Sequence, residues 1–227
     1  KKNIFEVKFS FSREHLFSLL NKYGAMPIPP YLKKSSLSRD ELIKKYQTIF
    51  AKTEGSSAAP TASLHFTDKV FQKLDEKEIE RLFVTLHVGL GTFAPITNEN
   101  IIQKKLHNEY YEVDKQTLRC IDTLKQEKKK LVAVGTTVVR TLESIETWDG
   151  FHIPSFQKTN LFIFPPYDFK LVDIMITNFH LPKSSLMMLV EAFLQHKKAK
   201  RKLVELYNIA IKNDFRFYSF GDAMLIL

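Results

Sequence analysis

Two histidines stand beside short polar segments whose composition suits proton transfer next to a bound small molecule. His87 precedes Gly89-Leu90-Gly91-Thr92, and His180 closes the segment Thr177-Asn178-Phe179-His180. Histidine exchanges protons near neutral pH and therefore serves as a general acid or base. Glycine lets a backbone approach a ligand closely. A histidine at the end of a strand can equally be a structural residue, so both interpretations stay open.

A third polar segment, Gly135-Thr136-Thr137, separates an apolar run from an expected helix at residues 138–146. The first turn of a helix carries free amide groups and a partial positive charge, which favour a phosphate or a carboxylate. Arg140 lies one turn into this helix and adds a full charge, unless it pairs with Glu143 on the helix surface. A plain helix cap is the alternative interpretation.

Metal binding is not expected from this sequence. The histidines His65, His87, His107 and His180 form no short ligand cluster, and Cys120 is the one cysteine. Zinc sites use such clusters, with ligands a few residues apart along the chain. The lone thiol also excludes a disulfide framework and fits a reducing, cytosolic environment.

Basic residues outnumber acidic ones, which points to an anionic partner. Lysine plus arginine is 34 and aspartate plus glutamate is 25, so the formal charge is +9. Such a surplus favours nucleic acid. Residues 197–202 place five basic side chains in six positions, and residues 216–222 (RFYSFGD) combine a cation with aromatic rings that could stack on bases. The alternatives are a solvated helix end and a core strand whose Arg216 and Asp222 pair.

The remaining composition is that of a globular protein. Apolar residues make up 44% and charged residues 26% of the 227 residues, which excludes a disordered or collagen-like chain. The longest apolar stretch, near Leu186–Leu194, contains Glu191 and is too short to cross a membrane. We therefore expect no membrane association.

Three apolar runs should position the polar segments. Residues 82–88, 131–134 and 171–177 each end in one of these segments, and the last two runs lead into helices at 138–146 and 185–194. Apolar strands joined by helices predict an α/β fold with a mixed, largely parallel sheet covered on both faces. Ligands in such folds bind beyond the carboxyl ends of the strands, so the three segments should converge there.

Other elements are expected from shorter signals. Ser12 and Thr67 are typical helix caps, and alternation of apolar and charged residues is typical of a strand. These signals predict helices at 12–21 and 67–81 and strands at 5–9 and 162–165.

Eight segments, taken in order, match one enzyme family. They are residues 24–31 (GAMPIPPY), 46–48 (YQT), 58–66 (AAPTASLHF), 84–93 (VTLHVGLGTF), 107–109 (HNE), 134–144 (VGTTVVRTLES), 177–185 (TNFHLPKSS) and 215–224 (FRFYSFGDAM). They resemble the S-adenosylmethionine:tRNA ribosyltransferase-isomerases of queuosine biosynthesis, and the resemblance covers nearly the whole chain.

This resemblance implies a specific reaction. The ribosyl part of S-adenosylmethionine is transferred to 7-aminomethyl-7-deazaguanine at the wobble position of a tRNA with a GUN anticodon. It is isomerised to an epoxycyclopentanediol, which gives epoxyqueuosine, while adenine and methionine leave. S-adenosylmethionine is thus the ribosyl donor, and no metal is expected. The resemblance further implies a cytoplasmic enzyme, which we expect to be a monomer.

The resemblance also implies an architecture. The main domain would be a three-layer α/β/α sandwich, with a small β-barrel inserted near its N-terminus. Residues 1–12 would be the last part of that barrel and residues 13–227 the α/β domain, whose own first part has no counterpart here. Three residues depart from the family pattern. Ser63 and Pro166 replace glycines, and Lys104 replaces a histidine, which argues against a metal pair there.

Residue roles follow from motif position and side-chain chemistry. Proton transfer is assigned to His87, His180 and Asp222, with His65 and Glu109 in reserve. The expected S-adenosylmethionine contacts are Gly89, Gly91, Thr92, Gly135, Thr136, Thr137, Arg140 and Asn178. Of these, Thr136, Thr137 and Arg140 would hold the methionine carboxylate or a tRNA phosphate. The expected RNA contacts are Arg216, Lys197, Lys198, Lys200, Arg201 and Lys202.

Two other functions remain open at this point. A tRNA-binding module without catalysis would bind RNA and release no adenine. An ordinary methyltransferase would add one carbon rather than a five-carbon unit, although the glycine-rich first loop and the acidic ribose contact of a dinucleotide-type fold are missing.

Overall fold

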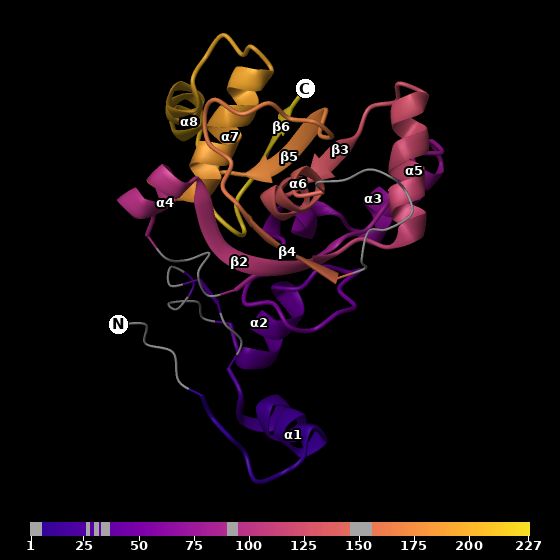
Figure 1. Cartoon of the computed structure of the whole chain (residues 1–227), viewed down its shortest axis with the longest axis vertical. Helices are drawn as coiled ribbons and strands as arrows, with labels where there is room; N and C mark the ends of the chain where they lie inside the picture. Colours follow the sequence, from indigo (N-terminus) through magenta and orange to yellow (C-terminus); the bar gives the residue numbers. More distant parts are fainter. Residues whose placement is uncertain (1–5, 26–27, 30–31, 33–36, 90–94, 146–155) are drawn as a thin grey trace. The chain divides into compact units, whose positions relative to one another are not determined.

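The chain forms two compact units, Lys1–Lys45 and Tyr46–Leu227, in a computed structural model that describes residues 6–25, 28–29, 32, 37–89, 95–145 and 156–227. The larger unit contains every described strand and all the candidate site residues that the structure describes (Figure 1). The assignment of residues 1–12 to a separate barrel domain stays a prediction.

The smaller unit contains helices α1 (Arg13–Tyr23) and α2 (Arg39–Lys45). The Ser12 hydroxyl accepts a backbone N–H of the first turn of α1, which confirms the predicted cap. Arg39 donates from Nε to the carbonyl of Gly24 at 2.8 Å and from Nη2 to that of Asn21 at 2.9 Å. This side chain therefore satisfies carbonyls at the end of α1.

The larger unit contains a three-stranded antiparallel sheet in the order β1-β2-β4. Its strands are β1 (Thr85–His87), β2 (Lys105–Glu112) and β4 (Phe156–Leu161). His87 lies opposite Tyr110, and Tyr110 lies opposite Lys158. Successive side chains of a strand point to opposite faces. One face of the sheet therefore carries these three residues, and the other carries the buried Glu109 and Tyr111.

A second sheet has the order β3-β5-β6. Its strands are β3 (Val132–Val134), β5 (Ile174–Asn178) and β6 (Ala223–Ile226). β3 and β5 are parallel, whereas β6 runs antiparallel to β5. The loops after β3 and β5 therefore leave the same edge of the sheet, as the sequence predicts, whereas the run at residues 82–88 contributes β1 to the other sheet.

The mixed α/β class is confirmed, but several expected strands differ. Only one described strand pair is parallel, so the expectation of a largely parallel sheet is wrong for the described strands. Residues 6–9 form no strand, and residues 162–165 follow the end of β4. Residues 6–9 are exposed and have no partner strand among the described residues, so their alternating pattern gives no ladder.

Helices surround the two sheets (Figure 1). They are the 3-10 helix η2 (Thr61–His65), α3 (Asp68–Asp75), α4 (Asn98–Gln103), α5 (Lys115–Gln126), α6 (Thr136–Glu143), α7 (Ser185–His196) and α8 (Leu203–Lys212). Thr67 caps α3 as predicted, although that helix ends at Asp75 rather than Arg81.

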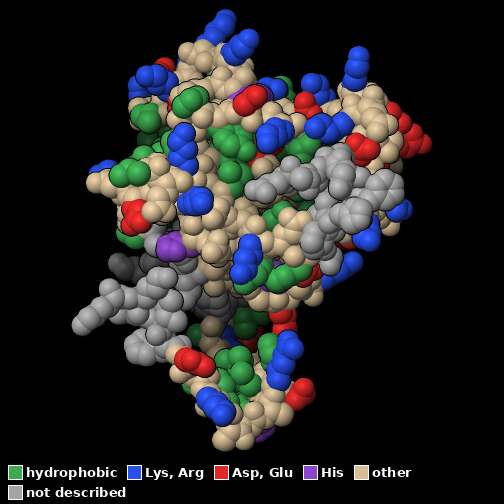
Figure 2. Space-filling model, in the orientation of Figure 1, with side chains coloured by type: hydrophobic (Ala, Val, Ile, Leu, Met, Phe, Trp, Pro, Cys, Tyr) green, Lys and Arg blue, Asp and Glu red, His purple; other side chains and the backbone are tan. Residues whose placement is uncertain are grey.

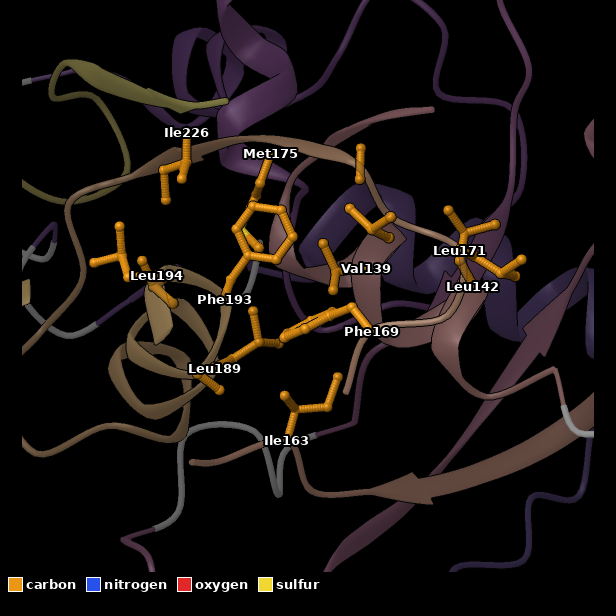
Figure 3. Close-up of a cluster of buried hydrophobic side chains, with 14 of the residues drawn as sticks. Val139, Leu142, Ile163, Phe169, Leu171, Met175, Leu189, Phe193, Leu194 and Ile226 are labelled. Atoms are coloured by element: carbon orange, nitrogen blue, oxygen red, sulfur yellow. The ribbon is translucent and has the colours of Figure 1, made fainter. Parts of the chain in front are cut away.

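The hydrophobic core lies where α6 and α7 pack together beside the second sheet. Figure 3 shows Val139 of α6, Met175 of β5 and Phe193 of α7 within one cluster, and all three are fully buried. The ring of Phe169 meets Phe193 edge-on at 4.9 Å between centroids. This packing fixes α6, which carries the third polar segment, against the sheet.

Glu143 holds the loop before β5 against the end of α6. Its Oε1 accepts the N–H groups of Leu171 and Val172 at 2.9 and 3.2 Å, and its Oε2 accepts that of Lys170 at 2.9 Å. Glu143 is therefore engaged with backbone and is not the partner of Arg140 that helix spacing allows.

We expect Glu143→Gln to lower the free energy of unfolding by about 2 kcal/mol, because an amide N–H₂ would then face a buried backbone N–H. Urea unfolding followed by circular dichroism measures this. Glu54→Gln, at an exposed loop position, is the matched control and should change stability by less than about 0.5 kcal/mol. Equal stability of the two variants would contradict the anchoring role.

Candidate functional site

Glu109 and Arg140 form a buried ion pair that joins the first sheet to α6. Arg140 Nη1 lies 2.7 Å from Glu109 Oε2, and the two side chains are 7% and 2% exposed. The other carboxylate oxygen, Oε1, accepts the N–H of Gly89 at 3.1 Å. The reserve candidate Glu109 thus holds Arg140 and the segment after β1 in place.

The guanidinium of Arg140 keeps one edge available. Its Nε and Nη2 atoms are buried and have no hydrogen-bond partner within the described residues. These two nitrogens form the side-on edge of a guanidinium, which grips a carboxylate or phosphate through two parallel hydrogen bonds. A buried donor without an acceptor costs about 1–3 kcal/mol. This edge therefore suits an anionic ligand group.

The N-terminus of α6 lies in the same part of the molecule. Gly135 is its N-cap residue, with φ at +96°, and no side chain caps the helix. The N–H of Gly135 donates to Ile176 of β5 at 2.8 Å. Side chains of a helix lean toward its N-terminus, so Arg140 leans toward this first turn, where Thr136 is buried and Thr137 partly buried. Backbone amides and guanidinium can act together on one anion.

Asn178 ends β5 and adds a second unsatisfied donor. Its Oδ1 accepts the hydroxyl of Thr61 at 3.0 Å, which ties η2 to the end of β5. Its Nδ2 is buried and has no partner within the described part of the chain. The amide is therefore oriented by Thr61 and has a donor left for a ligand.

His180 is held as a neutral imidazole. Its ring Nε2 shares a hydrogen bond with the hydroxyl of Thr177 at 2.8 Å, and its backbone N–H donates to the Tyr207 hydroxyl at 2.8 Å. Burial of the ring lowers the pKa of His180 to about 4, because a low-dielectric surrounding disfavours the charged form. At neutral pH this histidine therefore acts as a hydrogen-bonding group and is a weak base.

His87 occupies a different environment at the end of β1. A Cβ on Gly55 would lie 3.1 Å from Nδ1 of His87, so only glycine, here with φ at +118°, lets the loop approach this closely. The other ring nitrogen lies 4.0 Å from a Glu112 carboxylate oxygen. The loop is fixed by a hydrogen bond from Ser57 N–H to the Val88 carbonyl at 2.8 Å.

Two exposed rings beside His87 were not singled out from the sequence. Tyr110 and Phe156 stack with an interplanar angle of 16° and 4.8 Å between centroids, and Lys158 Nζ lies 5.2 Å from the Tyr110 centroid. The exposed fractions are 38% for Tyr110 and 48% for Phe156. Stacked rings next to a cation are typical of surfaces that take unpaired nucleobases. The sequence signal for these rings lies in residues 109–112. In a strand, successive side chains point to opposite faces, so Tyr110 lies on the face opposite the buried Tyr111.

Asp222 pairs with Arg216 through two contacts. Its Oδ2 accepts the backbone N–H and its Oδ1 accepts Nη2 of Arg216, both at 2.7 Å. These hydrogen bonds lower the pKa of Asp222 and keep its carboxylate charged. His65, which is exposed, lies near enough to lower that pKa further. The pairing that the sequence left as an alternative is thus formed, and the proton-transfer role of Asp222 stays a prediction.

The remaining predicted residues fall into two groups. Gly91 and Thr92 lie outside the described residues. Residues 197–202 lie between α7 and α8, at the opposite edge of the second sheet from the segments after β3 and β5. In the described ranges, no group of three or more histidine, cysteine or acidic side chains is arranged to hold a metal ion. The helices of those ranges are also too short or too polar to span a bilayer.

Comparison with known proteins assigns a family. The sequence pattern of a family described as "Queuosine biosynthesis protein" matches residues 1–226. A Sulfurihydrogenibium protein named S-adenosylmethionine:tRNA ribosyltransferase-isomerase is 49% identical over 92% of this chain and 59% of its own length. A Moorella thermoacetica protein of the same name is 46% identical over 97% of this chain and 62% of its own. The chain thus spans about three fifths of the length of these relatives.

A solved structure supports the same relationship. The crystal structure of S-adenosylmethionine tRNA ribosyltransferase from Thermotoga maritima aligns with a TM-score of 0.56 and 41% sequence identity. The alignment covers 73% of this chain and 51% of that one.

The Glu109–Arg140 pair should be strongly coupled. We expect Glu109→Gln and Arg140→Met each to lower the free energy of unfolding by about 3 kcal/mol, because each leaves a buried polar group without its partner. The double variant should lose clearly less than the sum of the two. Urea unfolding of all three variants tests this. Asp75→Asn, which breaks the exposed pair with Arg81, should cost less than about 1 kcal/mol. Additive losses would rule out the coupling.

The lowered pKa of His180 predicts an acid-dependent loss of stability. The unfolded chain takes up a proton near pH 6.5, whereas the folded protein does so only near pH 4. The stability that depends on the neutral His180 ring is therefore fully present above pH 6.5 and is lost as the pH falls toward 4. The free energy of unfolding should fall by up to about 3 kcal/mol over this range. We expect His180→Gln to flatten this slope. Unfolding free energies measured from pH 7.5 to 4.5 test it, and an unchanged slope would contradict a neutral buried ring.

Proposed function

The chain belongs to the queuosine biosynthesis protein family, and we propose on that premise that the protein transfers the ribosyl part of S-adenosylmethionine to a tRNA and isomerises it. The acceptor is 7-aminomethyl-7-deazaguanine at the wobble position of a GUN anticodon, and the product is epoxyqueuosine. Adenine and methionine are released. The structural observation that supports this proposal is the buried edge of Arg140 beside the first turn of α6, which has no hydrogen-bond partner among the described residues.

The methionine part of S-adenosylmethionine fits this edge. Its carboxylate can accept from Nε and Nη2 of Arg140 and from first-turn amides at Thr136 and Thr137. Glu109 positions the guanidinium from the other side. The Nδ2 of Asn178, which has no partner in the described part of the chain, supplies one further donor.

His87 is the strongest candidate for the base. The sulfonium makes the neighbouring C–H groups acidic, and the reaction must remove a proton there. A general base works best when its pKa lies near the operating pH. The partly buried His180, with a pKa of about 4, does not meet this condition. His180 instead orients substrate through its neutral ring, and Asp222 keeps Arg216 in position.

The RNA would lie over the exposed face of the first sheet. The stacked rings of Tyr110 and Phe156, close to His87, offer a surface for a base taken out of its stack. Arg216, whose side chain is 73% exposed, would meet the anticodon backbone. Residues 197–202 would meet phosphates farther away.

The finer architectural and cellular expectations are also part of this proposal. They are a three-layer sandwich with a β-barrel ending at residue 12, a monomeric enzyme, a cytoplasmic location and a reaction without metal.

The test is adenine release from S-adenosylmethionine in the presence of a tRNA transcript that carries the modified base. We expect His87→Ala to lower the rate at least about 100-fold, since general-base groups contribute roughly that much or more. His180→Ala and Asp222→Asn should lower it by less than about tenfold. Arg140→Lys should raise KM for S-adenosylmethionine, because lysine cannot form two parallel hydrogen bonds.

Two controls accompany this test. His107→Ala, at an exposed position of β2, should release adenine at the parent rate. The mass of the modified RNA separates ribosyl from methyl transfer. RNA binding without adenine release by the parent protein would reject the catalytic proposal, and full activity of His87→Ala would reject the assignment of the base.

A further inference from the structure

A basic cavity of about 290 Å³ lies between the ends of α5 and α7. It is lined by six lysines, namely Lys125, Lys128, Lys129, Lys130, Lys170 and Lys197. Leu131 and Asp173, which precede the parallel strands β3 and β5, also line it. The cavity therefore lies at the amino-terminal edge of these strands, whereas the candidate site lies beyond their carboxyl ends.

Few acidic groups balance these lysines. Asp173 Oδ1 lies 3.3 Å from Lys130 Nζ, and its other oxygen accepts the N–H of Leu131 at 3.0 Å. Lys129 pairs with Glu127 at 2.6 Å. Lys197 donates to a backbone carbonyl, that of Asp173, at 3.0 Å.

Three lysines of the cavity remain unpaired. Lys125, Lys128 and Lys170 have no ion pair with another described residue. Two further acids lie nearby: Asp168, which is 3.2 Å from His196 and almost fully exposed, and Glu80, whose charge helps to raise the pKa of Lys129. The cavity thus holds a surplus of positive charge that an anion would relieve.

The turns at the ends of α5 and α7 position several of these lysines. In the turn that follows α5, Lys128 lies in the left-handed region at φ 56°. The N–H of Lys128 donates to the Lys125 carbonyl, and that of Lys129 donates to the Leu124 carbonyl. α7 ends in the same way at Lys198, with φ 54°. This turn usually takes glycine. Each helix end carries only about half a negative charge, so the helix dipoles do not neutralise the lysines.

We propose that this cavity binds backbone phosphate of the RNA substrate, at a distance from the reacting base. The inference rests on the proposed function for the identity of the RNA. Lys197 at the cavity continues directly into the exposed cations Lys198, Lys200, Arg201 and Lys202. Figure 2 shows several lysine and arginine side chains on this upper part of the molecule, with a few acidic side chains among them. A basic surface that extends beyond the cavity favours a polyanion over a single free phosphate.

The position of the cavity sets a length requirement on the RNA. Asp173 precedes the five-residue strand β5 and Asn178 ends it, so the two residues lie roughly 16 Å apart at 3.3 Å per residue. An anticodon stem-loop cut back to its loop and the first few base pairs, and held at the carboxyl edge, would present few phosphates there. A complete tRNA, with its longer helical arm, would reach both edges.

The test compares two RNA substrates, a full-length tRNA and an anticodon stem-loop, with the protein in its complete natural form. We expect Lys128→Glu/Lys170→Glu to raise KM and Kd for the full-length tRNA about tenfold and to reduce the slope of log K against log salt by about 1–2. KM for the stem-loop should change less than about twofold. Lys128→Gln/Lys170→Gln should show a smaller change of the same kind. Lys212→Glu, in the last turn of α8, is the matched control and should change neither.

Each outcome decides the inference. Equal KM, Kd and salt slope for the charge-reversed and parent proteins would overturn it, provided that melting temperatures show both are folded. Binding of inorganic pyrophosphate at the cavity that leaves the Kd for tRNA unchanged would assign the site to a free anion and also overturn the inference. Failure of the parent protein to release adenine would reject the proposed function separately, because the binding measurements do not depend on turnover.

Discussion

The buried ion pair between Glu109 and Arg140 is the constraint on which the candidate site depends. Arg140 belongs to the helix after β3, and Glu109 belongs to the other sheet. Burying two charges is costly unless each is paired and hydrogen-bonded. Glu109 meets this requirement with Arg140 and Gly89. Arg140 meets it through Nη1, whereas its Nε and Nη2 atoms are buried without a hydrogen-bond partner among the described residues.

Carboxylates that accept backbone N–H groups recur through the larger unit. Glu143 holds residues 170–172, Asp173 holds Leu131, Glu191 holds Leu203 and Asp222 holds Arg216. All four acids fix loops, and two of them, Asp173 and Asp222, also pair with a cation. The chain has 25 acidic residues against 34 basic ones, so internal use of the acids leaves more of the cations unpaired. The use of these carboxylates as acceptors for backbone N–H groups therefore contributes both to the shape of the loops and to the basic surface.

Local sequence patterns predicted helix caps and strands, but they did not predict contacts between residues far apart in the sequence. The apolar runs that became β3 and β5, and the caps at Ser12 and Thr67, were read correctly because neighbours along the chain determine them. The antiparallel sheet was missed because its strand β2 alternates polar and apolar residues within a largely polar segment. For Arg140, helix spacing offered Glu143, whereas its partner lies 31 residues earlier. The low pKa of His180 likewise arises from burial, which the sequence does not display.

The direction of the strands explains why the two edges of the second sheet obtain positive charge differently. At the carboxyl ends of β3 and β5, helices begin, so the N-terminus of α6 contributes free amides and a single arginine suffices. At the amino ends, α5 and α7 terminate and present carbonyl oxygens, which repel an anion. Positive charge at that edge must come from side chains, and the lysines at both helix ends supply it. A substrate with anionic groups along its length is the ligand class that can use both edges at once.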